Sequence, residues 1–176
     1  VLLVTSDLDM LQLLDERTVL LQPHRGVTNL KKIDLEEFEK EWGISPEQWI
    51  DVLALSGDPS DNIAGVPGIG EKTAVKLIRQ FGSWEGILKN LSLLPPKLRE
   101  AIESNRDKVE ENRKLVALER DLPLDLEIKA WGWSKVDKNK LFQKLDALEF
   151  RKVKERLLKN RVNSGSLFSR SSEEKE

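Results

Sequence analysis

Two pairs of aspartates are the side chains of this sequence best suited to binding a metal ion. Asp7 and Asp9 follow the apolar run of residues 1–4, and Asp58 and Asp61 stand three residues apart in a segment rich in turn-forming residues. Carboxylate oxygens are the ligands that Mg²⁺ takes in proteins, together with several waters. The two pairs therefore predict a divalent-metal site, provided that the fold brings them together.

Each pair also has a purely structural interpretation. The second pair, together with Ser60 and Asn62, consists of residue types whose side chains bond to nearby backbone in turns. The first pair can simply end a strand and cap the helix that follows. The metal interpretation is favoured by the combination of both pairs with the glycine-rich segment that comes next.

That segment, residues 65–70, contains three glycines and opens an amphipathic helix expected over residues 72–81. The first N–H groups of a helix have no intrahelical acceptor and can bind a phosphate. Gly68 and Gly70 would let the backbone approach that phosphate, and lysines in the opening turns of the helix would add positive charge. Such a contact reads the nucleic-acid backbone and carries no sequence information.

The glycine-rich segment does not match the nucleotide-binding loops. The P-loop pattern needs a lysine directly after its last glycine, whereas Glu71 separates Gly70 from Lys72 and no strand precedes the loop. The dinucleotide fingerprint is longer than the G-x-G found here. A helix-hairpin-helix that grips duplex phosphates fits better, and a plain connector between helices is the structural alternative.

Three motifs, in the same order along the chain, resemble one protein family. Residues 57–74 read GDPSDNIAGVPGIGEKTA, residues 4–13 contain T-x-D-x-D-x-x-Q-L, and residues 145–150 contain L-x-x-L-E-F. Together they resemble the helix-3-turn-helix segment, a strand end and a short closing helix of the 5'-to-3' exonuclease and flap endonuclease family, which includes the nuclease domain of bacterial DNA polymerase I. The resemblance runs to about residue 158. Ala64 stands where the family usually carries proline.

The resemblance implies a metal-dependent hydrolase that removes nucleotides or flaps from DNA 5' ends. In the two-metal scheme, cations about 4 Å apart activate a water molecule and stabilise the leaving oxygen. Asp7, Asp9, Asp58 and Asp61 would serve mainly the second of two Mg²⁺ or Mn²⁺ sites, with Asp7 in a bridging position. The residues expected at the DNA are Gly65, Gly68, Ile69, Gly70, Lys72, Thr73 and Lys76. The resemblance also implies a K⁺ held by hairpin carbonyls and bridging to the phosphate.

Clustered carboxylates repel one another, so each is expected to raise the pKa of the others and to leave the metal-free site strained. The alternative from another class of function is a non-catalytic helix-hairpin-helix module that binds the duplex backbone. In the resembled family, about half of the nuclease domain precedes the position of residue 1, including further metal ligands. This chain alone is therefore expected to show negligible nuclease turnover.

The hydrophobic pattern predicts a buried strand at residues 1–4 and a second strand at residues 18–21, joined by a short helix. After Gly26 the pattern predicts only helices. They are expected at residues 35–42, 46–56, 72–81, 84–88, 96 to about 118, 138–145 and 151–159. Asp34 and Ser83 are expected to cap two of them, and Gly43 is expected to end the first.

The predicted fold class is a mostly helical α/β fragment. Residues 1–32 would form the C-terminal strands at the edge of a Rossmann-like, PIN-like nuclease sheet. Residues 33–160 would form a SAM-like, helical DNA-binding domain with the helix-3-turn-helix, and residues 161–176 a disordered polar tail. His24 is expected in a loop. The tryptophans at positions 42, 49 and 84 are expected to pack in or beside the core, while Trp131 and Trp133 receive no assignment.

Composition excludes several classes of function. The sequence has no cysteine, which rules out disulfides, thiolate catalysis and cysteine-type zinc sites. No apolar run approaches the roughly 20 residues that cross a bilayer. The net charge of −2 divides unevenly: residues 1–61 hold 5 basic and 13 acidic side chains, residues 62–118 hold 10 and 7, and residues 119–176 hold 14 and 11. The mildly basic part begins where the glycine-rich hairpin begins, which suits a local phosphate-binding surface.

The expected partner is double-stranded DNA with a 5' end or a 5' flap, without any membrane. The sequence leaves open a free-standing nuclease or one fused to a DNA polymerase domain. A monomer in the bacterial cytoplasm, associated with the nucleoid, is expected.

Overall fold

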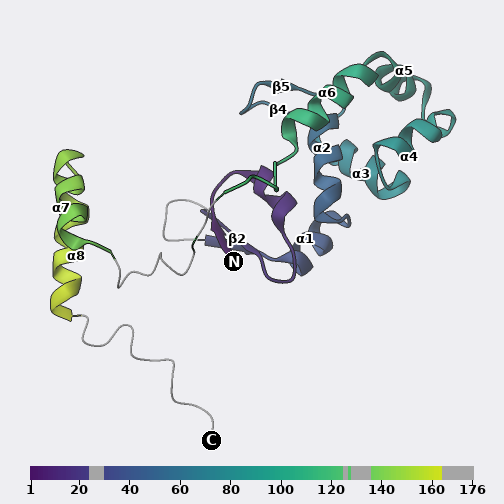
Figure 1. Ribbon diagram of the computed structural model, residues 1–176. Helices are drawn as coiled ribbons and strands as arrows, with labels where there is room; N and C mark the ends of the chain where they lie inside the picture. The colour runs from purple at the N-terminus through teal and green to yellow at the C-terminus, as the bar shows by residue number, and fades with distance from the viewer. Residues whose placement is uncertain (24–29, 125–126, 128–135, 164–176) are drawn as a thin grey trace, which may run out of the picture. The chain divides into compact units, whose positions relative to one another are not determined.

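The computed structural model describes residues 1–23, 30–124, 127 and 136–163, and the chain forms two compact units, Val1–Asp121 and Leu122–Glu176. His24, Trp131, Trp133 and residues 164–176 lie outside the described residues (Figure 1), so the expectations for them stay predictions. Among the residues that are described, no helix has both the length and the apolar character required to cross a bilayer.

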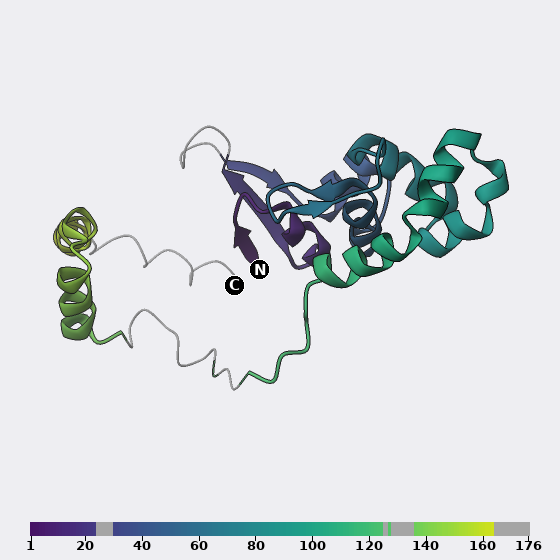
Figure 2. The same cartoon turned by 90° about the horizontal axis from the view of Figure 1, so that it is seen from above.

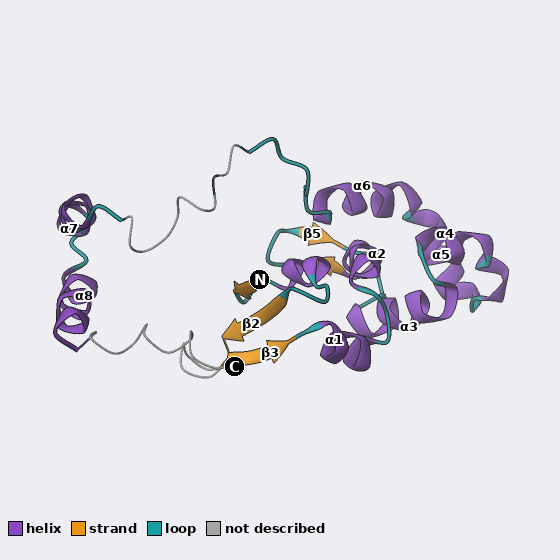
Figure 3. Cartoon of the chain, turned by 60° about the horizontal axis from the view of Figure 1, so that its bottom comes forward, coloured by secondary structure: helices purple, strands orange, loops and turns teal. Residues whose placement is uncertain are grey.

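A three-stranded sheet opens the first unit. β1 (Leu2–Val4) pairs in parallel with β2 (Val19–Pro23), and β2 pairs antiparallel with β3 (Leu30–Ile33), which gives the strand order β1-β2-β3. β2 and β3 lie side by side in Figure 3. The two predicted strands are confirmed within a residue or two. The third strand was missed, because only Ile33 of its four residues is buried and no alternation marks it.

The prediction that residues 1–4 form a buried strand is wrong for this chain. Val1, Leu2 and Val4 are between 64% and 75% exposed. In the described part of the chain, β1 has a hydrogen-bonded neighbour on one side only, and no element covers these side chains. The apolar run therefore forms an edge strand with an open surface.

The helices follow local capping signals closely. The 3₁₀ helix η1 (Leu8–Leu13) links β1 to β2, and α1 (Leu35–Trp42) starts at Asp34, whose carboxylate accepts the Glu37 N–H at 3.0 Å. Gly43, with φ +61°, ends α1 in the left-handed conformation that glycine tolerates. The short 3₁₀ helix η2 (Pro46–Gln48) runs directly into α2 (Trp49–Ser56). These ends confirm the predicted boundaries.

The second half of the first unit is helical apart from one small hairpin, made of β4 (Gly57–Asp58) and β5 (Ile63–Ala64). The remaining helices are α3 (Glu71–Phe81), α4 (Trp84–Lys89), η3 (Leu91–Leu93), α5 (Pro96–Ser104) and α6 (Arg106–Val116). The predicted long helical region after residue 95 is thus two helices divided at Asn105. The mostly helical α/β class is confirmed.

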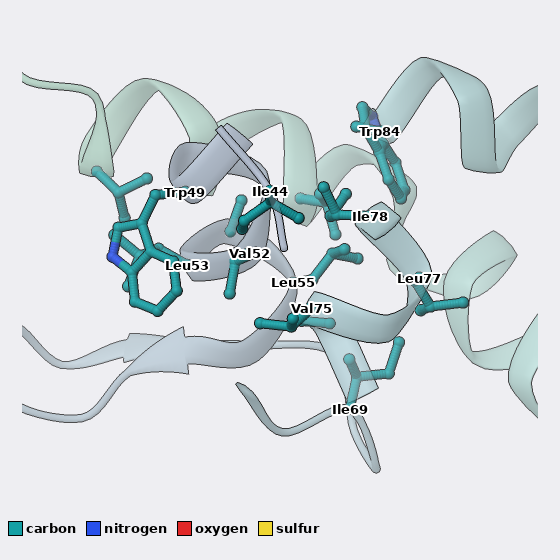
Figure 4. Packing of buried hydrophobic residues seen from close by; sticks show 14 of the residues in the cluster. Ile44, Trp49, Val52, Leu53, Leu55, Ile69, Val75, Leu77, Ile78 and Trp84 are labelled. Carbon is teal, nitrogen blue, oxygen red and sulfur yellow. The ribbon is translucent and has the colours of Figure 1, made fainter. Parts of the chain in front are cut away.

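The core of the first unit is built around α2, which packs against both α3 and α6. Figure 4 shows Val52 and Leu55 of α2 facing Val75 and Ile78 of α3, and all four are buried. Trp49 and Trp84 are at most 1% exposed, which confirms that these tryptophans pack in the core. Burial of this apolar surface fixes α2, and α2 leads directly into the hairpin with Asp58.

The second unit contains the helices α7 (Lys138–Ala147) and α8 (Arg151–Asn163). The predicted helices at residues 138–145 and 151–159 are confirmed within four residues, whereas residues 145–150, which resemble a short closing helix, do not form one continuous helix but end α7 and turn into α8. The reason is Glu149, whose φ of +56° lies in the left-handed region and cannot continue an α-helix. α8 extends to Asn163, so residues 161–163 are helical and do not belong to the predicted disordered tail.

Candidate functional site

The first aspartate pair lies where β1 runs into η1. Asp7 is the N-cap of η1, and its carboxylate accepts the backbone N–H of Asp9 at 3.0 Å. The N–H of Asp7 is in turn donated to the hydroxyl of Thr5 at 3.0 Å. This local network leaves Asp7 exposed and turns Asp9 inward, where only 9% of the residue is exposed.

The second pair lies on the β4–β5 hairpin. Asp58 pairs with Ile63 in the ladder, and the turn between them includes Asn62 with φ +59°. The Asp58 carboxylate accepts the N–H of Ser60 at 2.7 Å and its hydroxyl at 2.5 Å. These bonds, the hydroxyl first, lower the pKa of Asp58 below its ordinary value. The structural role expected of turn residues is therefore present, and it coexists with the arrangement described next.

The fold brings the two pairs together although about fifty residues separate them. One carboxylate oxygen each of Asp9, Asp58 and Asp61 lies within 4.8 Å of the other two. Figure 2 shows the small hairpin beside the purple N-terminal segment. Asp7 is not part of this group of three oxygens. It lines the cleft onto which Asp58 and Asp61 open.

The charge state of Asp9 reflects this position. Burial, followed by the nearby carboxylates of Asp7, Asp58 and Asp61, raises the pKa of Asp9 from 3.8 to about 6. The expectation that the carboxylates raise each other's pKa is thus confirmed at Asp9, although burial is the larger cause. It is wrong at Asp58, where hydrogen bonds from Ser60 act in the opposite direction.

The three oxygens fit a hard divalent cation. Bonds of 2.0–2.6 Å to such an ion place its oxygen ligands roughly 3 to 5 Å apart, which matches the spacing found here. The buried Oδ1 of Asp9 has no hydrogen-bond partner. A buried carboxylate oxygen without a partner is costly, and a cation would satisfy it.

A cleft of about 650 Å³ leads to these carboxylates. The residues that line it include Ser6, Asp7, Trp49, Asp58 and Glu71. Glu71 and Trp49 were not predicted at the site. A signal for Glu71 did exist, since it directly follows the hairpin glycine at the start of α3. Nothing in the sequence could show that Trp49, a core residue that is 1% exposed, also borders the cleft.

The glycine-rich hairpin follows β5 and leads into α3. Val66 and Ile69 are buried, and the Ile69 N–H donates to the carbonyl of Val66 at 3.0 Å. The two apolar side chains anchor the hairpin on the core and leave Gly68 and Gly70 on the exposed rim. The buried side chain of Ile69 can therefore make no contact with a ligand, and any contact at this residue would be made by its backbone.

The glycines of this region fall into two kinds. A Cβ on Gly65 would lie 2.2 Å from the backbone of Ser56, and a Cβ on Gly57 would lie 2.3 Å from the Gly65 nitrogen. These two glycines are required by packing between the arms of the hairpin. A Cβ on Gly68 or Gly70 would meet nothing within 4 Å. Gly68, with φ +85°, is still required by its conformation, whereas Gly70, with φ −91°, is required by neither.

The residues predicted at the start of α3 are placed as a phosphate site would need them. Lys72 and Lys76 are exposed, and Thr73 is half-buried. The carbonyl of Gly70 accepts the N–H groups of Thr73 and Ala74, at 3.0 and 2.9 Å. The N–H groups of Glu71 and Lys72 come too early in α3 to have an acceptor within the helix, so they can bind an anion.

The chain is similar to known proteins over most of its length. The family model "5'-3' exonuclease, C-terminal SAM fold" matches residues 44–139. DNA polymerase I of Mycobacterium leprae is 37% identical over 170 residues, which are 94% of this chain and 18% of that protein. The thermostable DNA polymerase I of Thermus thermophilus is 43% identical over 125 residues, 71% of this chain and 14% of that protein. The chain thus spans less than a fifth of the length of these relatives.

Solved structures are similar as well. The 5'-exonuclease of T5 with bound zinc ions has a TM-score of 0.56 and 28% identity, covering 65% of this chain and 42% of that one. The bacteriophage T5 flap endonuclease in complex with DNA and metal ions has a TM-score of 0.57 and 27% identity, with the same coverage.

Proposed function

Because the chain belongs to the 5'-3' exonuclease family, in its C-terminal SAM-fold part, we propose that it supplies metal ligands and a DNA grip to a nuclease that hydrolyses DNA phosphodiester bonds. The observation that carries this proposal is the convergence of Asp9 with Asp58 and Asp61. Carboxylates whose only roles were to cap a helix and to close a turn would not have to lie close to one another. The alternative, a module that only binds duplex DNA, leaves the unpartnered buried oxygen of Asp9 without an explanation.

Divalent ions bound at this site would activate a water molecule and stabilise the leaving oxygen of the phosphodiester. We infer that Asp9, Asp58 and Asp61 hold such an ion, Mg²⁺ or Mn²⁺, and that Asp7 joins them by a change of side-chain rotamer. Asp7 is exposed at the rim of the cleft, and the change would give up the bond that its carboxylate accepts from the N–H of Asp9. The remaining carboxylate oxygens then bind the ion's waters.

The glycine-rich hairpin, residues 65–70, supplies the DNA contact in this proposal. Gly65, Gly68, Ile69 and Gly70 shape a backbone surface, and Lys72, Thr73 and Lys76 add charge and donors next to it. A further support is Gly70, the N-cap of α3: glycine is common at this position, but neither its backbone conformation nor its packing within the chain requires that a side chain be missing there. Close approach of a phosphate from outside the chain would explain it.

The finer assignments belong to the same proposal. The DNA would be a duplex with a 5' end or a 5' flap, and carbonyls of the glycine-rich hairpin would hold a K⁺ ion that offsets the charge of a bound phosphate. The whole protein would carry a polymerase domain, as the relatives' name, DNA polymerase I, suggests. It would act as a monomer at the bacterial nucleoid. Residues 1–32 belong to the nuclease core and residues 33–160 to the DNA-binding domain.

Two variants test the two halves of the proposal separately. Asp58→Asn should weaken Mn²⁺ binding in calorimetry by at least tenfold and leave duplex binding without metal unchanged. Gly70→Ala should fold with a stability close to that of the wild type, because alanine restricts the unfolded chain but is a poorer N-cap residue than glycine, and it should weaken duplex binding in fluorescence anisotropy. Lys72→Ala, at the start of α3, should weaken duplex binding as well, and Lys97→Ala, at the start of α5, is its matched control for a lost helix-start charge. If Gly70→Ala binds the duplex with the affinity of the wild type, the glycine-rich hairpin does not contact DNA and this half of the proposal is wrong.

A further inference from the structure

Two buried side-chain amides connect α6 to the segments that carry the metal-binding aspartates. Asn112 and Gln12 are 5% and 1% exposed, and each bonds to backbone far away in the sequence. We propose that α6 sets the spacing of the two aspartate pairs, with Asn112 and Gln12 as positioning residues. This inference rests on the proposed metal centre and names residues that determine its geometry.

Asn112 bonds to α2, which leads into the β4–β5 hairpin, and to β5, the second strand of that hairpin. Its Nδ2 donates to the carbonyl of Ala54, in α2, at 3.0 Å and to the carbonyl of Ala64, in β5, also at 3.0 Å. Asp58 and Asp61 lie between these two carbonyls in the chain. One side chain of α6 thereby ties the segment before the aspartates to the segment after them, and α6 lies next to β5 and α2 in Figure 3.

Gln12 makes the corresponding connection for the first pair. It lies on η1, three residues after Asp9. Its Nε2 donates to the carbonyl of Val116, the last residue of α6, at 2.8 Å, and its Oε1 accepts the N–H of Leu118 at 3.3 Å. Arg120 donates to the backbone carbonyl of Gln12 and strengthens the same junction.

The two connections lie one helical turn apart. Asn112 and Val116 are four residues apart on α6, so about 6 Å of rigid helix separates them along its axis. Apolar contacts also bring η1 against η2 and α2 and set its approximate position. Apolar contacts are not directional, whereas hydrogen bonds with two fixed acceptors are. The hydrogen bonds of the Asn112 and Gln12 side chains can therefore hold the carboxylates at metal-binding distance against their mutual repulsion.

A purely structural role for Asn112 is the competing interpretation. Asn105 provides a matched comparison, because its side-chain amide also donates to a backbone carbonyl, that of Ala101 at 2.8 Å. That bond is local to the end of α5 and reaches neither aspartate pair. Loss of the Asn105 amide should lower stability and leave the metal site unchanged.

The experiment compares Asn112→Ala with Asn105→Ala in the complete chain. Amide hydrogen exchange of residues 57–66 should become at least tenfold faster in Asn112→Ala and stay as in the wild type in Asn105→Ala. Mn²⁺ affinity, measured by calorimetry, should fall about tenfold in Asn112→Ala alone, the usual effect of losing a residue that orients metal ligands. Asn112→Ser, which keeps one donor, is the second variant if the alanine protein does not fold, and it should show both changes to a smaller degree.

Several outcomes would overturn the inference. Unchanged exchange of the hairpin would show that Asn112 does not hold it, and faster exchange with unchanged Mn²⁺ affinity would show that its role is structural only. Failure of the proposed function gives a different result, namely equal Mn²⁺ affinity of the wild type and Asp58→Asn. In that case the exchange measurement still decides whether Asn112 holds the hairpin.

Discussion

Replacing Asp9 by asparagine should stabilise the metal-free protein while removing metal binding. The buried carboxylate has a pKa of about 6, against 3.8 in an unperturbed aspartate. The folded state therefore binds the proton more tightly than the unfolded state, and the ionised carboxylate disfavours folding. An asparagine side chain at this position would be neutral at every pH and nearly identical in shape.

The expected magnitude follows from these two pKa values. At 1.36 kcal/mol per unit of pKa, the ionised carboxylate lowers the free energy of unfolding by about 3 kcal/mol at pH 7. At pH 5 the carboxyl is mostly protonated in the folded state, and the effect falls to about 1.5 kcal/mol. The stability gained in Asp9→Asn should accordingly shrink by roughly half between pH 7 and pH 5, because the wild type itself becomes more stable as the pH falls through 6.

The assay is urea denaturation of both proteins at the two pH values, with near-ultraviolet circular dichroism as the signal. Saturating Mn²⁺ should then stabilise the wild type by about 2.7 kcal/mol at one hundred times its dissociation constant, and should not stabilise the variant. Asp15→Asn is the control, since hydrogen bonds from Thr18 and Arg17 lower the pKa of that exposed carboxyl and no stability should be gained. An Asp9→Asn protein no more stable than the wild type at pH 7 would refute the reasoning.

Three further predictions concern the hairpin and the core. Lys72→Ala and Lys76→Ala should each reduce the slope of log affinity against log salt by roughly 0.9, if each lysine contacts one phosphate. Gly57→Ala should destabilise the fold by more than about 3 kcal/mol in urea denaturation, because φ is +76° and the new Cβ would overlap the opposite arm of the hairpin. Asp51→Ala should cost about 1 to 3 kcal/mol, because the buried N–H of Trp84 loses its acceptor while Arg113 keeps its ion pairs with Glu85 and Glu110, and it should not change Mn²⁺ affinity.

Each of these has an outcome that contradicts it. A salt slope reduced equally by Lys97→Ala would mean that the lysines act through overall charge. A Gly57→Ala protein as stable as the wild type would show that the hairpin arms can separate freely. Loss of Mn²⁺ affinity in Asp51→Ala would show that this buried carboxylate also positions the metal site.

What could be predicted from the sequence was mostly local. Asp34, Gly43 and Ser83 end or begin helices where expected, because a cap depends on residues within one turn of it. β3 was missed because its stability comes from pairing with β2. The break between α7 and α8 was predicted, but not that Glu149 makes it, because a left-handed residue other than glycine leaves no clear signal.

The candidate site divides in the same way. The aspartates could be chosen from their types, spacing and family resemblance, and a helix cap was expected of the first pair, but only the fold shows that Asp7 is the cap and Asp9 the buried member. Asn112 had no sequence signal, since its importance depends on two carbonyls that are 58 and 48 residues away along the chain. Gln12 belongs to the strand-end motif, yet its partner on α6 is 104 residues away.

The central claim is that Asp9, Asp58 and Asp61 hold one divalent cation. Its most direct test is anomalous diffraction from crystals of the chain grown with Mn²⁺. The account predicts one anomalous peak within about 2.5 Å of a carboxylate oxygen from each of the three residues, and no peak at that position in Asp58→Asn crystals. Full Mn²⁺ occupancy elsewhere, with no density between these three carboxylates, would contradict it.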